Sequence, residues 1–325
     1  MKSSCSPRAK CLLQFLAVLA FLWPRMSCAA VPSVERMIVI GINGLSPDGI
    51  LNSQTPHFRK LMKAGAYSMQ ARAVMPTSSS PNWASMIMGA GPEQHGVTSN
   101  DWMPDKFDIA PVAVGPGGIF PTIVGVMREQ RPQFNIAVFH DWKDFGRLLE
   151  TNTPNVLKHV KDSIETAAEG LGYWRTNRPH FLFLHFDGVD HAGHSFGWRS
   201  TQYYKQVEMV DALIGAITDA VEESGLTGST VFLVTADHGG KGKKHGGNSM
   251  DELLIPWILK GPGVREDTEL KTRIDTFDTA PTIAHIFGLK TPTCWIGKPV
   301  LDAFKGSSAA SSTSGKATLP GQRTQ

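Results

Sequence analysis

Cysteine is scarce in this chain and unevenly placed. The 325 residues contain four cysteines, and three of them, Cys5, Cys11 and Cys28, lie within the first thirty positions. Without that segment only Cys294 remains, so no disulfide can form within the rest of the chain. A disulfide-stapled scaffold is therefore excluded. Stability must come from a hydrophobic core, which a chain of this length can bury.

Acidic residues are absent from positions 1–30, and the apolar run in that segment is short. Basic residues at the start precede the run Leu12–Trp23, which only Gln14 interrupts, and small residues follow at 27–30. The run is too short for a comfortable membrane span. This layout predicts a cleaved signal peptide over residues 1–30, with an uncleaved anchor as the less favoured alternative. We expect an exported protein, periplasmic or extracellular, with no membrane span after signal removal.

The excess of positive charge also belongs to this segment. The whole chain has a formal net charge of +3, but residues 31–325 carry 28 basic and 29 acidic side chains. Charge therefore gives no support for a surface that coats nucleic acid. Residues 305–325 are rich in Ser, Ala, Thr and Gly and predict a disordered tail. Residues 31–304 lack repeats and linkers and predict one domain, whose oligomeric state the sequence does not indicate.

Short apolar runs alternate with helical patterns along residues 31–304. The runs predict buried strands because β-branched and aromatic residues follow one another without polar alternation. They are Met37–Ile42, Phe181–Phe186, Thr230–Thr235 and Ile255–Leu259. Helices are indicated from Thr55-Pro56 to Gly65, and from Thr201 to Gly225 with apolar residues three or four apart. This order predicts a three-layer α/β/α sandwich with a mostly parallel central sheet.

Side chains that could hold a metal ion, most of them carboxylates and imidazoles, follow three of the predicted strands. Because chemistry in such folds gathers at the carboxyl ends of the strands, we expect these side chains to share one edge of the sheet. His nitrogen and Asp oxygen together suit zinc or a similar divalent ion. The residues concerned are Asn43 after the first strand, Asp187, Asp190, His191 and His194 after the second, and Asp237, His238 and His245 after the third.

A run of hydroxyl side chains precedes a short predicted helix, Trp83–Met88. The segment reads Pro76-Thr-Ser-Ser-Ser-Pro-Asn-Trp83. A hydroxyl at this place can cap the helix, and the free N–H groups there also attract phosphate. The local sequence alone favours the cap.

Taken together, these segments resemble the alkaline phosphatase superfamily, in its nucleotide pyrophosphatase/phosphodiesterase-like branch. Five motifs occur in the family's order over nearly all of residues 31–304. They are Pro76-Thr-Ser-Ser-Ser-Pro-Asn82, Gly91-Pro-Glu-Gln-His-Gly96, Asp190-His-Ala-Gly-His194, Thr235-Ala-Asp-His-Gly239 and His245-Gly246. The resemblance implies that residues 31–304 form an alkaline phosphatase-like hydrolase domain.

The resemblance also implies two divalent metal ions, zinc above all, and a small phosphorylated substrate. One ion would be held by Asp190, His194 and His245, and the other by Asp237, His238 and the Ser79 oxygen with help from Asn43. Aligning Pro81-Asn82 with the family makes Ser79 the nucleophile, which would form a phosphoserine intermediate, and Asn82 a ligand of a nonbridging substrate oxygen. The implied activity is hydrolysis of phosphoric esters, of the phosphodiesterase or nucleotide pyrophosphatase type. A formylglycine sulfatase is disfavoured because Trp83 stands where that motif needs arginine.

Asn43 departs from the family pattern, which has aspartate at this position. An amide offers a neutral oxygen and no charge, so metal affinity at the nucleophile side should fall. Two other hypotheses follow. One is a weakened or inactive relative that binds phosphorylated ligands; the other, less favoured, is a transferase of phosphorylated head groups. On sequence grounds, Asn43→Asp is expected to tighten metal binding and raise hydrolysis.

Overall fold

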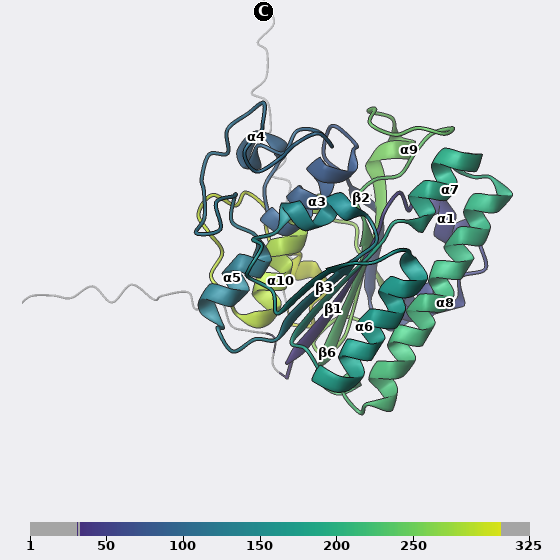
Figure 1. Ribbon diagram of the computed structural model, residues 1–325. Helices are drawn as coiled ribbons and strands as arrows, with labels where there is room; N and C mark the ends of the chain where they lie inside the picture. Colours follow the sequence, from purple (N-terminus) through teal and green to yellow (C-terminus); the bar gives the residue numbers. More distant parts are fainter. Residues whose placement is uncertain (1–30, 32, 307–325) are drawn as a thin grey trace, which may run out of the picture.

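The centre of the molecule is an eight-stranded sheet with the strand order β4-β3-β5-β1-β6-β7-β2-β8 (Figure 1). The computed structural model describes residues 31 and 33–306, so the predicted signal peptide and residues 307–325 of the predicted tail lie outside the described residues. All pairings are parallel except those of β7 with β6 and β2, so only β7 runs against the other strands of this sheet. The strands are β1 (Arg36–Ile42), β2 (Ala66–Arg72), β3 (Ile136–His140), β4 (Val156–His159), β5 (Phe181–Phe186), β6 (Thr230–Ala236), β7 (Leu254–Lys260) and β8 (Thr268–Glu269).

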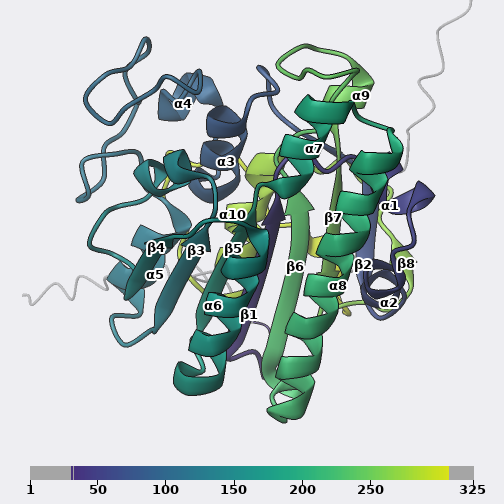
Figure 2. The ribbon, with the colours of Figure 1, turned by 45° about the vertical axis from the view of Figure 1, so that its right-hand side comes forward.

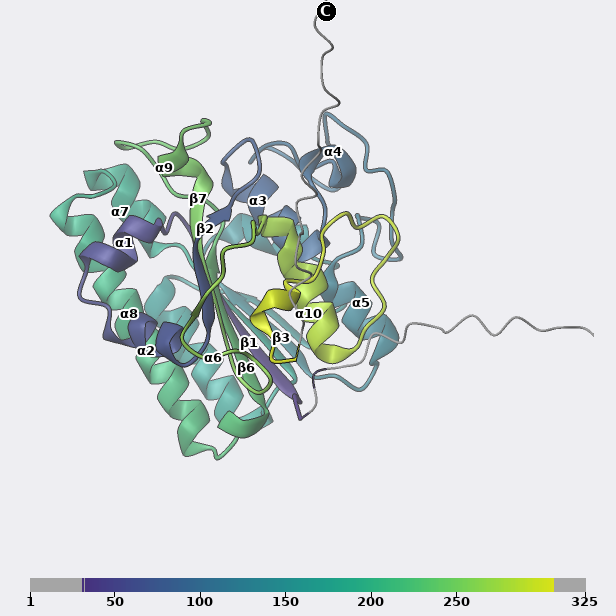
Figure 3. The same ribbon diagram turned by 180° about the vertical axis from the view of Figure 1, so that it is seen from behind.

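Helices cover both faces of the sheet. On one face lie α1 (Pro47–Asn52), α2 (Pro56–Lys63), α6 (Ser163–Asn177), α7 (Gly188–Phe196) and α8 (Thr201–Glu223) (Figure 2). The other face carries α3 (Ser79–Met88), α4 (Pro92–His95), α5 (Ile123–Gln130) and α10 (Thr279–Phe287) (Figure 3), and the short α9 (Met250–Leu253) precedes β7. Short 3₁₀ helices lie at Lys143–Leu148, Thr227–Ser229, Thr276–Asp278 and Leu301–Ala303. The predicted three-layer sandwich with a mostly parallel sheet is confirmed.

The strands in the middle of the sheet are those whose positions the sequence predicts most accurately. Every residue of β5 and β6 is buried, and β1 is buried from Met37 onward. Ile38 of β1 pairs with Leu182 on one side and Phe232 on the other. A strand covered on both faces needs an uninterrupted apolar run, which is why the predicted bounds of these strands agree with the structure to within a residue. The two-residue edge strand β8 and the half-exposed β4 have no such run and were not predicted.

Helix α3 is held directly against β1. All ten of its residues are buried, and the ring of Trp83 packs edge-on against Phe145 and Phe183. Gly41 of β1 makes this approach possible, since a Cβ at that position would lie 2.7 Å from the Trp83 ring. The first residue of α3, Ser79, is thereby placed at the carboxyl end of the central strand. Within residues 33–306, no helix has the length and apolar character needed to cross a membrane.

Replacing Gly41 by alanine should destabilise the protein by about 1–3 kcal/mol, because the rigid Trp83 ring cannot yield without moving α3. Gly172→Ala is the matched control, since Gly172 lies in the exposed interior of α6 with no atom within 4 Å of its would-be Cβ. That control should gain up to about 1 kcal/mol from helix propensity. Urea unfolding of both variants tests the pair; equal shifts in the two would contradict the close packing of α3 on β1.

Candidate active site

The turn after β1 brings the three loops of the central strands together. The backbone N–H of Gly44 donates to Asp237 Oδ1 at 3.0 Å, which ties the end of β1 to the end of β6. Gly44 has a φ of +69°, and a Cβ there would lie 2.9 Å from atoms of Asp190 on α7, the helix after β5. Glycine is therefore required both by the backbone conformation and by the close approach of Asp190.

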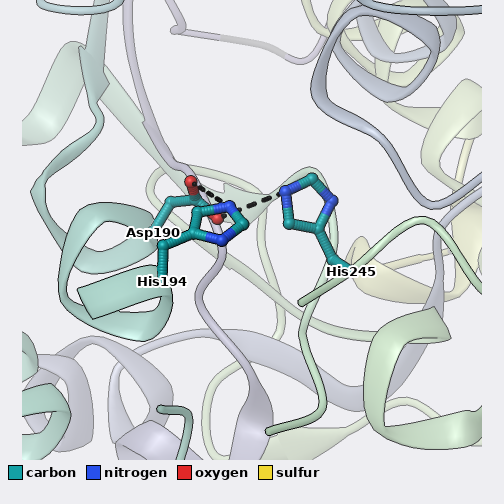
Figure 4. A group of neighbouring side chains, drawn as sticks. All are labelled: Asp190, His194 and His245. Carbon is teal, nitrogen blue, oxygen red and sulfur yellow. Dashed lines mark ion pairs between the residues drawn. The ribbon is translucent and has the colours of Figure 1, made fainter. Parts of the chain in front are cut away.

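One cluster at this edge consists of Asp190, His194 and His245, whose potential ligand atoms all lie within 4.8 Å of one another (Figure 4). Asp190 and His194 are one turn apart on α7, and His245 comes from the loop after β6. His194 Nε2 lies 3.3 Å from Asp190 Oδ2, and His245 Nε2 lies 3.7 Å from Asp190 Oδ1. A carboxylate with two imidazoles is a donor set that zinc and related ions accept.

The second cluster consists of Asp237, His238 and Ser79. His238 Nε2 lies 3.2 Å from the Ser79 Oγ and 3.2 Å from Asp237 Oδ2. The rings of His238 and His245 stack with centroids 3.8 Å apart, so the two clusters adjoin. Burial, reinforced by His245 nearby, lowers the pKa of His238 to about 3, and burial raises the pKa of Asp237 well above its ordinary value. His238 is thus a neutral imidazole at physiological pH.

Backbone carbonyls orient all three imidazoles in the same way. In His194, His245 and His238 the Nδ1 atom faces a carbonyl oxygen, which requires a hydrogen on Nδ1 and leaves Nε2 as the lone pair of a neutral ring. The carbonyls are those of Lys243, Thr77 and Gly239, at 3.0, 2.8 and 2.8 Å. An Nε2 lone pair and a carboxylate oxygen are both acceptors, so their contact is unfavourable unless a proton or a cation lies between them. The tautomers therefore suit metal binding.

Unpartnered buried oxygens point to the same conclusion. Asn43 Oδ1, Asp190 Oδ1 and Asp237 Oδ2 are buried without a hydrogen-bond partner in the part of the chain that the structure describes. Such orphaned acceptors are uncommon in folded proteins because they give up their hydrogen bonds to water. The donor set of both clusters fits divalent cations, which would supply the missing interactions.

Among the hydroxyls of the 77–80 segment, that of Ser79 is directed at the clusters. Helix α3 begins at Ser79 rather than at the predicted Trp83, and Ser78 at its N-cap position makes no capping hydrogen bond through its side chain. The Thr77 hydroxyl donates to the carbonyl of Gly247 and accepts from the N–H of Gly246. Thr77 is therefore part of the scaffold, while Ser79 Oγ faces His238.

The Asn82 side chain is directed away from the position that the resemblance implies. Its Nδ2 lies within hydrogen-bond distance of the carbonyls of Val74, Pro76 and Ser78, and its Oδ1 accepts from the Val74 N–H at 2.7 Å. A carboxamide has two N–H donors, and these three carbonyls use both. Asn82 thus fastens the loop before α3 and keeps no donor for a substrate oxygen.

Two residues that the sequence did not single out lie against the 77–80 segment. Asn100 Oδ1 accepts from the Ser80 N–H at 2.8 Å. Arg147, in the 3₁₀ turn after β3, contacts the Ser80 hydroxyl at 3.3 Å and the Asn100 carbonyl, and pairs with Asp144 at 3.4 Å. No local pattern could have identified Arg147, because it is 67 residues from Ser80.

A comparison with known families agrees with this arrangement. Residues 37–115 and 120–255 match the family model for type I phosphodiesterase / nucleotide pyrophosphatase. The chain belongs to this family. The resemblance to the nucleotide pyrophosphatase/phosphodiesterase-like branch of the alkaline phosphatase superfamily is thereby confirmed.

Relatives within and around the type I phosphodiesterase / nucleotide pyrophosphatase family are much longer than the matched part. Human ectonucleotide pyrophosphatase/phosphodiesterase family member 1 is 27% identical over 197 residues, which is 57% of this chain and 21% of that protein. GPI ethanolamine phosphate transferase 1 of Yarrowia lipolytica is 24% identical over 312 residues, covering 83% of this chain and 33% of the relative. The chain thus spans about a fifth to a third of these relatives.

Solved structures share the fold. An inactive variant of murine ectonucleotide pyrophosphatase/phosphodiesterase 5, in complex with AMP, superposes with a TM-score of 0.70 at 15% identity and covers 83% of this chain and all of that one. A mutant of the alkaline phosphatase PafA gives a TM-score of 0.70 at 11% identity, with 85% of this chain and 100% of that chain covered. At these identities the likeness concerns the α/β/α architecture alone.

Thr77→Val tests whether the scaffold around His245 matters for metal binding. The substitution keeps the side-chain shape but removes both side-chain hydrogen bonds to the loop that carries His245, so zinc affinity of the metal-free protein should fall by about 10–100-fold. Calorimetric zinc titration measures the effect. Thr218→Val is the control, because that hydroxyl donates to the Gly215 carbonyl within α8. Unchanged zinc affinity in Thr77→Val would show that the loop is held by other contacts.

Proposed function

We propose that this protein is a metal-dependent hydrolase of phosphoric esters, of the phosphodiesterase or nucleotide pyrophosphatase type. The observation that carries the proposal is the convergence of Ser79 Oγ, His238 Nε2 and Asp237 Oδ2 beside the Asp190/His194/His245 cluster. Membership of the type I phosphodiesterase / nucleotide pyrophosphatase family supports it. Two divalent ions are proposed, most simply zinc, given the mixed nitrogen and oxygen donors.

Ser79 is proposed as the nucleophile. Its Oγ would attack phosphorus and break the P–O bond to the leaving alcohol or nucleotide fragment. The resulting phosphoserine, which on a diester substrate still carries the second ester group, would then be hydrolysed by water to free Ser79 and the phosphoryl product. Bound divalent ions supply Lewis-acid chemistry at such sites: they favour the serine alkoxide and stabilise charge on the phosphoryl oxygens. Because Ser79 lies at the first turn of α3, the N-terminal end of that buried helix adds a favourable field for the anionic substrate.

The remaining residues hold this geometry. Asp190, His194 and His245 would bind the ion farther from Ser79, and Asp237 and His238, with Asn43, the ion nearer to it. Asn82 fixes the loop that precedes Ser79. Asn100 and Arg147 fix its other side, and Arg147 brings a positive charge next to Ser80. Arg147 would thus add positive charge beside an anionic substrate at Ser79, although part of that charge is balanced by Asp144.

The proposed substrate is small and phosphorylated. Support comes from the related murine structure, which was determined in complex with AMP. Export to the periplasm or the cell exterior, with a signal peptide over residues 1–30, is part of the proposal. The relatives named ectonucleotide pyrophosphatase/phosphodiesterase support it, because the prefix "ecto" denotes an enzyme that acts outside the cell.

Metal analysis of the purified protein, together with nitrophenyl phosphate monoester and diester assays, tests the proposal. Two bound ions and preferential turnover of the diester are expected. One bound ion without turnover would favour the alternative of a binding protein that retains phosphorylated ligands but does not cleave them.

Ser79→Ala should abolish turnover, since it removes the attacking oxygen, while the fold and the Asp190/His194/His245 ion persist. Ser78→Ala is a matched control one residue away, with a side chain that makes no capping hydrogen bond. The control should keep activity within a few-fold of the parent. Full activity in Ser79→Ala would exclude Ser79 as the nucleophile. Loss in Thr77→Ala or Ser80→Ala with zinc still bound would then assign that role to the residue concerned.

Group transfer is the second candidate, because the alignment with GPI ethanolamine phosphate transferase 1 extends over 83% of the chain. A phosphoserine can be resolved by an alcohol as well as by water. Product analysis with added ethanolamine or glycerol separates the two activities: hydrolysis yields only the free phosphoryl product, whereas transfer yields a new phosphoester in proportion to the acceptor.

A further inference from the structure

A third buried carboxylate, Asp187, lies next to Asn43. Asp187 is at the N-cap position of α7, but its side chain makes no capping hydrogen bond there. Its Oδ1 instead accepts from Asn43 Nδ2 at 2.6 Å, and its Oδ2 lies 2.9 Å from His191 Nε2. The Asp187 side chain is only 9% exposed. A carboxylate this close to a proposed metal ligand affects both the orientation and the charge of that ligand.

The contact with Asp187 fixes the orientation of the Asn43 carboxamide. The reversed orientation would set two oxygen acceptors 2.6 Å apart, so the amide nitrogen must face Asp187. Asn43 Oδ1 then points away from Asp187, and this oxygen is buried without a partner among residues 33–306. The backbone on either side is also tied, with Asn43 N–H bonded to the Phe186 carbonyl and Gly44 N–H bonded to Asp237.

We propose that Asp187 is a positioning residue that supplies, through one hydrogen bond, the negative charge that position 43 lacks. By accepting from Nδ2, Asp187 holds Asn43 Oδ1 toward the ion beside Asp237 and increases the electron density on that oxygen. This is the outer-shell arrangement by which carboxylates orient and strengthen metal ligands. The inference rests on the proposed function, because it concerns the ion nearer to Ser79.

Charge at this edge changes the outcome expected for Asn43→Asp. With Asp187 in place, an aspartate at 43 would set two carboxylate oxygens at the present 2.6 Å contact, where they repel. The single substitution should therefore not strengthen the site, in contrast to the expectation from sequence alone. Combined with Asp187→Asn, the same aspartate would regain a hydrogen bond, now donated by residue 187.

A double-mutant cycle tests the inference. Metal-free wild type, Asp187→Asn, Asn43→Asp and the double variant Asn43→Asp/Asp187→Asn are titrated with zinc by calorimetry, and their thermal unfolding is followed without metal. Asp219→Asn is the control for the bare loss of a carboxylate, because Asp219 is exposed on α8. Both substitutions at the site are isosteric, so the fold should persist.

Asp187→Asn should weaken the binding of the zinc ion beside Asp237, taken as the second binding step, by about 10–100-fold. Binding of the ion at Asp190, His194 and His245, taken as the first step, should be unchanged. In the Asn43→Asp background the same substitution should have the opposite sign: it should tighten the second zinc-binding step and raise the melting temperature of the metal-free protein. The control should match wild type in both measurements.

An Asp187→Asn variant with wild-type zinc affinity in both steps overturns the inference, as does an effect of equal sign in both backgrounds. If wild type still binds two ions and Ser79→Ala abolishes turnover, such a result leaves the proposed function standing. A wild-type protein that takes up only one ion overturns both.

Discussion

Three buried carboxylates meet at the turn Asn43-Gly44, and the surrounding structure is arranged around that concentration of negative charge. Asp187 contacts the Asn43 side chain, Asp237 accepts from the Gly44 N–H, and Asp190 lies against the Gly44 Cα. Buried carboxylates repel one another unless hydrogen-bond donors or cations lie between them. His238, whose pKa burial lowers to about 3, does not supply that charge. The site is therefore suited to bound cations, and its stability should depend on them if they bind.

The strand order explains why this concentration occurs where it does. β1 lies between β5 and β6, so the turn after the central strand is flanked by the two loops that carry the acidic residues. The carboxyl ends of parallel strands share one edge, and only the reversed β7 departs from that direction. Helix α3 lies on the face of the sheet opposite to α7. The contact between Trp83 and Gly41 fixes its distance from β1, and Ser79 at its start lies at the same edge.

Sequence patterns predicted the elements whose environment is uniform. The runs of β1, β5 and β6 are apolar because both faces of those strands are covered, and the periodicity of α8 reports its single buried face. The two-residue strand β8 carries no pattern of this kind. β3 was missed although its five residues are all buried, since Ile136–His140 is short for a periodicity argument.

Side-chain partners were harder to predict than side-chain positions. The sequence placed Asp187 and Asn43 at the edge, but their hydrogen bond joins residues 144 positions apart and no local pattern encodes it. The family resemblance assigned Asn82 to the substrate because of its place in a motif, whereas its amide is used by carbonyls at most eight residues away. A motif therefore identifies the segment, and the folded backbone decides which of its side chains remain free for ligands.

Thr77 connects the loop that carries His245 to the segment that carries Ser79. Its carbonyl orients His245, its hydroxyl bonds to the backbone of Gly246 and Gly247, and two residues later the chain reaches Ser79. Any shift of the His245 loop must therefore move the start of the segment that carries Ser79. Conversely, an ion held by His245 would act on the same backbone that positions the Ser79 hydroxyl. Thr77 therefore joins the loop that carries His245 to the segment that carries Ser79, in addition to the stacking of the His238 and His245 rings.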